Sequence, residues 1–148
     1  DSNGEANSFE LYIESKEIEE PKFILYNGLD ILKNKVKSFN SDLNSIIKDN
    51  IKSEKIKITE SLGTMEAFEI HILNESHTLG NLIQNYALML ESDKLKFISY
   101  RNPHPLQNKI EIKIATVNNS KEEMLEIINS TCSNIISVLN KILDKVST

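Results

Sequence analysis

Residues 77–81 are His-Thr-Leu-Gly-Asn, and residues 101–112 are Arg-Asn-Pro-His-Pro-Leu-Gln-Asn-Lys-Ile-Glu-Ile. The first stretch opens a short helix, predicted from Thr78 to about Leu90, because apolar residues recur there every three or four positions. The second is a turn stiffened by Pro103 and Pro105, each of which fixes a φ angle and removes a backbone donor. This turn leads into a predicted strand, so the pair favours a fold of class α+β.

A strand followed by a long helix is predicted on the N-terminal side of these stretches. Apolar residues at 9, 11 and 13 alternate with Glu10, Tyr12 and Glu14, which is typical of a half-buried strand. Pro21 suits the first turn of a helix. Steps of four and three residues then define an apolar seam: Leu25, Leu29, Leu32, Val36, Phe39, Leu43 and Ile46. Gly28 lies inside this helix and should weaken it unless another backbone packs closely there.

The same unit returns at the C-terminal end. Isoleucines at 110, 112 and 114 alternate with charged residues, and Ser120 with Glu123 forms a capping box. A second seam follows: Leu125, Ile128, Cys132, Ile135, Leu139, Ile142 and Val146. Each helix has about 26 residues and so should measure roughly 40 Å. We interpret the repeat as a pseudo-dimer encoded in one chain, whose helices pair; the alternative is two unrelated amphipathic helices.

Residues 48–55 form a polar linker between the two units. Strands are predicted over 56–60, 68–73 and 95–100, with a turn near Gly63. The expected architecture is therefore an antiparallel sheet packed with two long heptad helices and one short helix.

Composition narrows the possible functions. The 22 acidic and 17 basic residues give a net charge of −5, which argues against a large phosphate-binding face and thus against direct nucleic-acid binding. No apolar run approaches the ~18 residues of a membrane span, so no membrane contact is expected. The single cysteine, Cys132, excludes an internal disulfide.

No catalytic, cofactor or metal site is predicted. The histidines at 71, 77 and 104 lack the spacing of zinc ligands. Glu75 and His77 could be drawn as an acid/base pair, but no nucleophile accompanies them. His77 is expected to cap the helix or to form a hydrogen bond at its start, and Cys132 to be a buried hydrophobe.

Two features of the opening stretches suggest packing or docking. Gly80 stands in the first helical turn, where glycine costs about 1 kcal/mol relative to alanine. We expect it to allow close packing against another backbone, although glycine could simply suit the helix entrance. The loop with Pro103 and Pro105, beside Arg101, is either a rigid connection or a docking loop.

Residues 66–117 are similar, strand by strand, to the small assembly subunits of multisubunit RNA polymerases: the archaeal L-type subunits, the eukaryotic eleventh subunits and, more distantly, bacterial alpha. That family usually carries an acidic residue where this chain has Ser76, which can still cap the helix. The residues that carry the resemblance and that it implicates in docking are His77, Thr78, Leu79, Gly80, Asn81, Arg101, Pro103, His104, Pro105 and Leu106.

Residues 9–15 and 26–37 resemble the end of the larger partner in such polymerases, which is the D-type component in archaea and the third-largest component in eukaryotes. Their position implies a fused subunit similar to that of large cytoplasmic DNA viruses, the asfarvirus kind above all. The implied division is residues 1–50 as the last strand and helix of the D-like half, 51–55 as a linker and 56–148 as the L-like dimerisation domain. Most of the D-like half is then expected upstream, in a longer chain.

The resemblance implies a non-catalytic assembly platform that forms an intramolecular alpha-like pseudo-heterodimer. Its implied partners are the largest and second-largest polymerase subunits and the small zinc-binding subunits of the tenth and twelfth types. A viral form would act in the host cytoplasm and be packaged in the virion, during early or late viral gene expression, and a cellular form would act in the nucleus. The alternatives are a heterodimerisation adaptor outside the polymerase, a small enzyme and a nucleic-acid binder. The fragment alone could self-associate through its helices.

Overall fold

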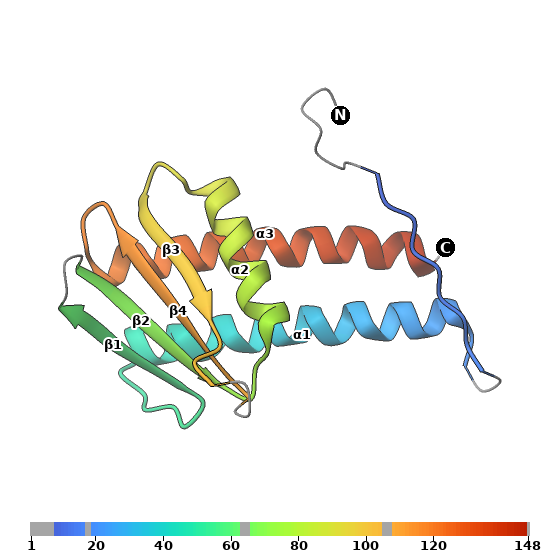
Figure 1. Cartoon of the computed structure of the whole chain (residues 1–148), viewed down its shortest axis with the longest axis horizontal. Helices are drawn as coiled ribbons and strands as arrows, with labels where there is room; N and C mark the ends of the chain where they lie inside the picture. The colour runs from blue at the N-terminus through green and yellow to red at the C-terminus, as the bar shows by residue number, and fades with distance from the viewer. Residues whose placement is uncertain (1–7, 17–18, 63–65, 105–107, 148) are drawn as a thin grey trace.

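The computed structural model describes residues 8–16, 19–62, 66–104 and 108–147. Figure 1 shows the elements in chain order. Their bounds are α1 Pro21–Lys48, β1 Ile56–Leu62, β2 Glu66–Leu73, α2 His77–Leu90, β3 Leu95–Arg101, β4 Lys109–Thr116 and α3 Lys121–Ser147. The turn expected at Gly63 lies outside the described residues, as do Pro105 and Leu106.

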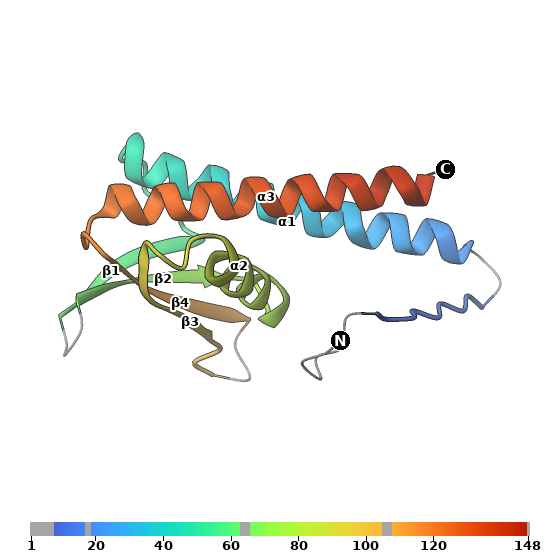
Figure 2. The ribbon, with the colours of Figure 1, turned by 90° about the horizontal axis from the view of Figure 1, so that it is seen from above.

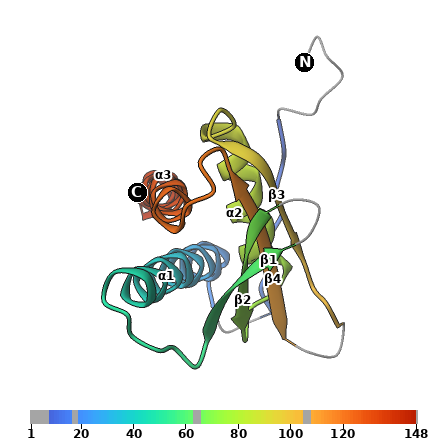
Figure 3. The same cartoon turned by 90° about the vertical axis from the view of Figure 1, so that its left-hand side faces the viewer.

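The four strands form one antiparallel sheet in the order β1-β2-β4-β3. The register aligns the isoleucines of neighbouring strands, with Ile70 opposite Ile112 and Ile72 opposite Ile110. Because side chains alternate along a strand, these isoleucines share one face, and all three helices lie on that face (Figure 3). The predicted α+β architecture of one sheet, two long helices and one short helix is confirmed.

The two long helices run antiparallel and side by side across the sheet (Figures 1 and 2). A reciprocal pair of amides joins them near one end. Asn44 donates to Oδ1 of Asn129 at 2.7 Å, and Asn129 donates back to Oδ1 of Asn44 at 3.2 Å. Asn44 also donates to the carbonyl of Asn40 at 2.7 Å. A half-buried polar pair on an otherwise apolar seam favours one helix register over its alternatives.

The core lies between the sheet and the overlapping halves of the long helices. On α1 the buried side chains are Val36, Phe39 and Leu43, all in the C-terminal half. On α3 the buried residues occupy more than one stripe, because this helix packs against α1, α2 and the sheet at once. They are Met124, Leu125, Ile127, Ile128, Thr131, Cys132, Ile135, Leu139 and Leu143.

The opposite halves of the long helices extend beyond the sheet (Figure 2). The seam is correspondingly less buried there, since Leu25 is half-buried and Ile142 is 39% exposed. Around Gly28 no described heavy atom lies within 4 Å of where a Cβ would stand, so the close packing considered for this glycine does not occur within the described residues. Further apolar side chains are exposed in these halves: Phe23, Ile24, Tyr26, Ile31 and Val138.

The strand expected over residues 9–14 is not formed. Residues 8–16 make neither helix nor strand, and Phe9, Leu11 and Tyr12 are 83%, 75% and 84% exposed. A β-strand is stabilised by hydrogen bonds to a neighbouring strand, and no described strand of this chain lies beside the segment. The alternation of apolar and polar residues therefore indicates that this segment favours an extended conformation. It does not show which strand would pair with it.

The helix caps follow the prediction in part. The backbone N–H of Glu123 donates to Ser120 Oγ at 3.0 Å, as a capping box requires. The Glu123 carboxylate, however, accepts from the backbone N–H of Asn118 at 2.8 Å. Ser76 occupies the N-cap position of α2 with extended backbone but makes no capping hydrogen bond through its side chain, so the expectation that it caps this helix was wrong.

Replacing Ile135 by aspartate tests the packing of α3. Ile135 is 1% exposed in the core, and an unpaired carboxylate buried there should cost about 3–5 kcal/mol. We expect the free energy of unfolding, measured by urea denaturation, to fall by that amount. Ser133→Asp is the control, because Ser133 is exposed on the same helix. Equal effects of the two changes would contradict the buried position of Ile135.

Candidate assembly surface

The two motif stretches meet at one end of the sheet. The β2–α2 connection is joined to the start of β4 by a hydrogen bond from Asn74 N–H to the Asn108 carbonyl at 2.6 Å. His77 is the first residue of α2, and its ring makes an edge-to-face contact with Tyr100 on β3, with ring centroids 5.8 Å apart. Two residues that are distant in the sequence are thus neighbours in space.

Gly80 packs closely, but its neighbour is a side chain of the same chain. A Cβ at position 80 would stand 2.5 Å from Cδ2 and 2.8 Å from Cγ of Tyr100. The expectation of contact with another backbone, in a mate or a large subunit, is therefore corrected. Glycine is needed because α2 lies directly against the Tyr100 ring, so any larger residue would push the helix away from β3.

The other motif residues divide between the core and the surface. Leu79 is buried, whereas His77, Thr78 and Asn81 are exposed. The exposed three line a hollow of about 400 Å³, together with Leu32 of α1 and the half-buried Leu82 and Tyr100. The surface at the start of α2 is therefore concave and is lined by half-buried apolar side chains and exposed polar ones.

An ion pair ties this region to the long helices. Lys35 of α1 donates to Glu75 Oε2 at 2.9 Å, across the connection that precedes α2. Beyond β3, Pro103 and His104 are exposed, and the His104 backbone N–H donates to Asn102 Oδ1 at 3.0 Å. That hydrogen bond shapes the described part of the loop in which docking residues were predicted.

The outer face of the sheet carries a charged network that the sequence analysis missed. Glu111 of β4 lies at its centre, with a side chain only 10% exposed. Arg101 on β3 approaches Oε2 through both Nε (2.9 Å) and a terminal nitrogen (2.8 Å). Lys109 and His71 Nδ1 approach Oε1 at 2.9 and 3.0 Å. One carboxylate therefore joins three adjacent strands.

Hydrogen bonds set the protonation state of this network. Burial by itself raises the pKa of Glu111, but donors on Lys109, Arg101 and His71 outweigh it and lower the pKa to about 2. A carboxylate accepts only, so Nδ1 of His71 must donate. Nε2 of His71, 3.0 Å from Thr59 Oγ1, can then accept from that hydroxyl in the neutral ring.

This network could not be found from residue types alone. Arg101, Lys109 and Glu111 lie close in sequence, but His71 joins them only through the β2–β4 register. The available signal was the alternation of charged residues with buried isoleucines on β4. That signal locates the outer face without identifying the residues across it.

The reactivity of Cys132 and the ability of acidic and histidine side chains to bind a metal depend on their surroundings. Burial raises the pKa of the Cys132 thiol to about 12, so its reactive thiolate is suppressed. Within the described ranges, no three histidine, cysteine or acidic side chains are grouped as metal ligands. None of the described helices combines the length and apolar character needed to cross a membrane.

Comparison with known proteins gives a consistent set of relatives. The family model described as the RNA polymerase Rpb3/Rpb11 dimerisation domain matches residues 67–145. A probable DNA-directed RNA polymerase II subunit RPB11 of Plasmodium chabaudi chabaudi is 37% identical over 90 residues, covering 60% of this chain and 64% of the relative. The corresponding Caenorhabditis elegans protein is 43% identical over 49 residues, covering 33% and 38%.

An archaeal relative completes the comparison. The DNA-directed RNA polymerase subunit Rpo11 of Sulfurisphaera tokodaii is 46% identical over 48 residues, covering 32% of this chain and 50% of the relative. The chain thus spans between 38% and 64% of the length of these three relatives.

A pair of glycine substitutions tests the contact between α2 and β3. Gly80→Ala should lower the free energy of unfolding by about 1–2 kcal/mol, since overpacking against Tyr100 outweighs the gain in helix propensity. Gly28→Ala is the matched control and should raise it by roughly 0.5–1 kcal/mol, because that position is open. Chemical denaturation measures both. Equal stabilisation by the two alanines would refute the close contact.

The low pKa of Glu111 predicts an acid-sensitive contribution to stability. Glu111 has a folded pKa of about 2 against an ordinary value of 4.5, so its contribution is complete above pH 4.5 and disappears as the pH falls toward 2. Glu111→Gln should cost about 2 kcal/mol at pH 7 and much less near pH 2.5, measured by urea unfolding across that range. Exposed Glu14→Gln is the control. A pH-independent cost would show that the charge of Glu111 is not responsible.

Proposed function

Since this chain belongs to the RNA polymerase Rpb3/Rpb11 dimerisation domain family, we propose that it is a non-catalytic assembly subunit of a DNA-directed RNA polymerase. The observation that carries the proposal is the position of the match. Residues 67–145 include β2, α2, β3, β4 and nearly all of α3, which are three of the four strands, the short helix that covers them and one of the two long helices. The chemistry of polymerisation would then belong to other subunits of the complex.

We further propose that the chain is an intramolecular pseudo-heterodimer. Residues 56–148 would be its L-like half, residues 1–50 the end of its D-like half, and residues 51–55 the linker. The antiparallel pair of α1 and α3 supports this division, because the sheet covers only the C-terminal half of α1 and the N-terminal half of α3. The uncovered halves carry exposed Phe23, Ile24 and Ile31 on α1 and Ile142 on α3.

A second sheet unit would suit these uncovered halves. Antiparallel helices have an approximate two-fold relation, so an equivalent unit could pack on the opposite ends as the described sheet does on these. The exposed strand-like residues 9–14 lie just before α1, where they could join such a sheet. In a longer chain containing these residues, the upstream part would supply that unit.

The proposed partners follow from the family. The L-like half, with the hollow at the start of α2, would meet the largest polymerase subunit. The D-like half would meet the second-largest subunit and the small zinc-binding subunits. A cellular form would act in the nucleus, and a viral form in the host cytoplasm and the virion. The asfarvirus-like origin is part of this proposal and rests on the order of the two halves.

An adaptor outside the polymerase is the competing function, since paired helices with an exposed apolar end could join other proteins. The exposed polar motif residues at the hollow favour the polymerase, because pairing of helices requires none of them. The two functions differ in which proteins accompany the chain in its native setting.

Affinity purification of the natural chain containing these residues tests the proposed function. We expect both large polymerase subunits to co-purify in near-equal amounts, identified by mass spectrometry. A double change of Ile31 and Ile142 to aspartate should reduce this recovery, because it charges the surface proposed for the second sheet unit. Ser133→Asp is the control for an added charge. Isolation without large subunits, under conditions that keep the polymerase intact, would replace this proposal with the adaptor.

A further inference from the structure

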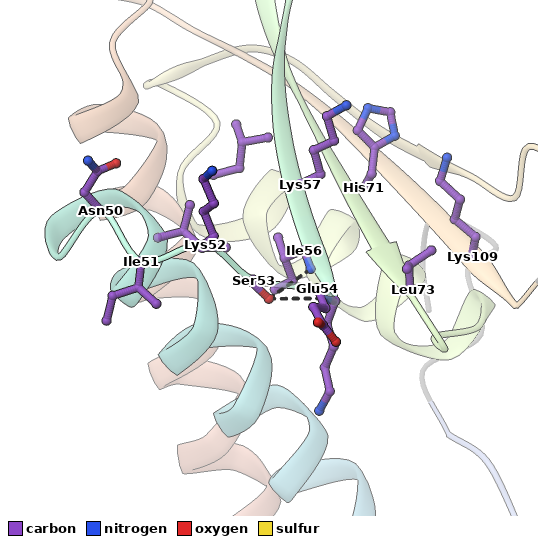
Figure 4. A pocket seen from close by; sticks show the side chains of 13 residues that line it. Asn50, Ile51, Lys52, Ser53, Glu54, Ile56, Lys57, His71, Leu73 and Lys109 are labelled. Atoms are coloured by element: carbon purple, nitrogen blue, oxygen red, sulfur yellow. Dashed lines mark hydrogen bonds between the residues drawn. The ribbon is translucent and has the colours of Figure 1, made fainter.

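The groove along β1 has no role in the function proposed above. It is a hollow of about 640 Å³ between the end of α1, the segment 49–55 and β1 (Figure 4). Four lysines line it, at positions 52, 55, 57 and 109, against one carboxylate, Glu54. This balance is the reverse of the whole chain, whose net charge is −5.

On the side away from β2, β1 has no neighbouring strand among the described residues. β1 is the edge strand of the sheet, with β2 as its neighbour. Leu73 N–H donates to the Lys55 carbonyl at 2.9 Å, and this register directs the backbone groups of positions 57 and 59 toward β2. The N–H and C=O groups of Ile58 and Glu60 therefore point to the free edge. The N–H group of Ile56 is not free, because it donates to Ser53 Oγ at 3.2 Å.

The two sides of the groove differ in character. Figure 4 shows Lys57 and His71 together on one side of β1, whereas Ile51 comes from the segment on the other side. Ile56 is buried and Ile58 half-buried on the side that faces the helices, and Ile46 and Ile51 also line the groove. Lys57 alternates with these isoleucines and is exposed on the outer side beside His71 (Figure 4), whereas Lys55, just before β1, is exposed and lies near Lys35 and Phe39 of α1. One side of the free edge is thus apolar and the other is cationic.

The lysines that line the groove differ in whether they already form an ion pair. Lys109 is engaged by Glu111 at 2.9 Å. Among the described residues, no ion pair involves Lys52, Lys55 or Lys57. An acidic side chain entering the groove would therefore meet these lysines without displacing an existing carboxylate.

We propose that this edge binds an extended segment of a partner protein in which apolar and acidic residues alternate, added to the sheet beside β1. Successive side chains of a strand point to opposite faces, so such a segment would place apolar residues toward Ile56 and Ile58 and carboxylates toward Lys57 on the outer face. Lys52 and Lys55 line the same groove and add to its positive charge. Its backbone would pair with the free groups of Ile58 and Glu60. Charge complementarity and the sidedness of the groove together select this occupant.

Binding of synthetic peptides to the purified chain tests the proposal. The probe is a fluorescein-labelled nonapeptide of alternating valine and glutamate, followed by fluorescence anisotropy. We expect saturable binding that weakens with salt, together with NMR shifts at the Ile58 and Glu60 amides. Replacing glutamate by lysine, or N-methylating alternate peptide nitrogens, should each weaken binding by about tenfold or more. The first change removes the charge match and the second removes the backbone donors.

Matched variants locate the site. Lys55→Glu with Lys57→Glu should weaken binding by about tenfold or more, whereas Lys96→Glu with Lys141→Glu, away from the groove, should change it less than about twofold. Both pairs change the net charge equally, and urea unfolding checks that each variant is folded. This test needs no other polymerase subunit, so its result is independent of the proposed function.

Three results would overturn the proposal. If the acidic probe does not bind, the lysines would instead be explained as charges that protect the edge strand against aggregation. Equal binding of the N-methylated probe would exclude strand addition. Self-association of the chain that is lost in both Lys55→Glu/Lys57→Glu and Glu10→Lys/Glu14→Lys would assign the groove to residues 8–16 of a second copy.

Discussion

The antiparallel contact between α1 and α3 is the constraint on which the rest of the structure depends. The sheet presents a continuous isoleucine face, and its four strands cannot cover that face themselves. α3 follows β4 directly and packs on it, but it leaves the side near β1 and β2 to α1. Because α1 precedes the sheet in the chain, the isoleucine face is completed by a helix that lies outside the residues matched by the family model.

The register of this helix pair has a polar determinant. Apolar seams that repeat every three or four residues can slide by one turn with little loss of buried area. The amides of Asn44 and Asn129 bond to each other in the observed register, and a slip by one turn would break both of these hydrogen bonds. The Asn44–Asn129 pair replaces apolar contacts on the seam, but it fixes how far α1 and α3 overlap. It therefore determines which parts of the two helices extend beyond the sheet. The position of the proposed second unit depends on this register.

Periodicity predicted much of the fold, because it reports which face of an element is buried. The isoleucines of β4 and the seams of the long helices follow directly from spacing. What spacing could not give was the identity of neighbours. Gly80 was recognised as a site of close packing, but its neighbour Tyr100 lies on a strand whose placement beside α2 depends on the whole sheet. The network around Glu111 likewise needs the registers of two strand pairs.

Residues 9–14 and the free edge of β1 are two further places where the sequence pattern does not identify a neighbour. The alternating segment has the pattern of a strand without a neighbour, and the edge has the free backbone groups of a strand without a neighbour. Geometry separates them within one chain. Six residues, 15–20, connect the segment to α1 and span at most roughly 20 Å when extended, whereas α1, with 28 residues, is roughly 42 Å long. The segment precedes the N-terminal end of α1 while the groove lies at its C-terminal end, so the connecting residues are too short for the two to pair in the same molecule. Each therefore agrees with a different one of the neighbours proposed above: a second sheet unit for the segment and a separate protein for the edge.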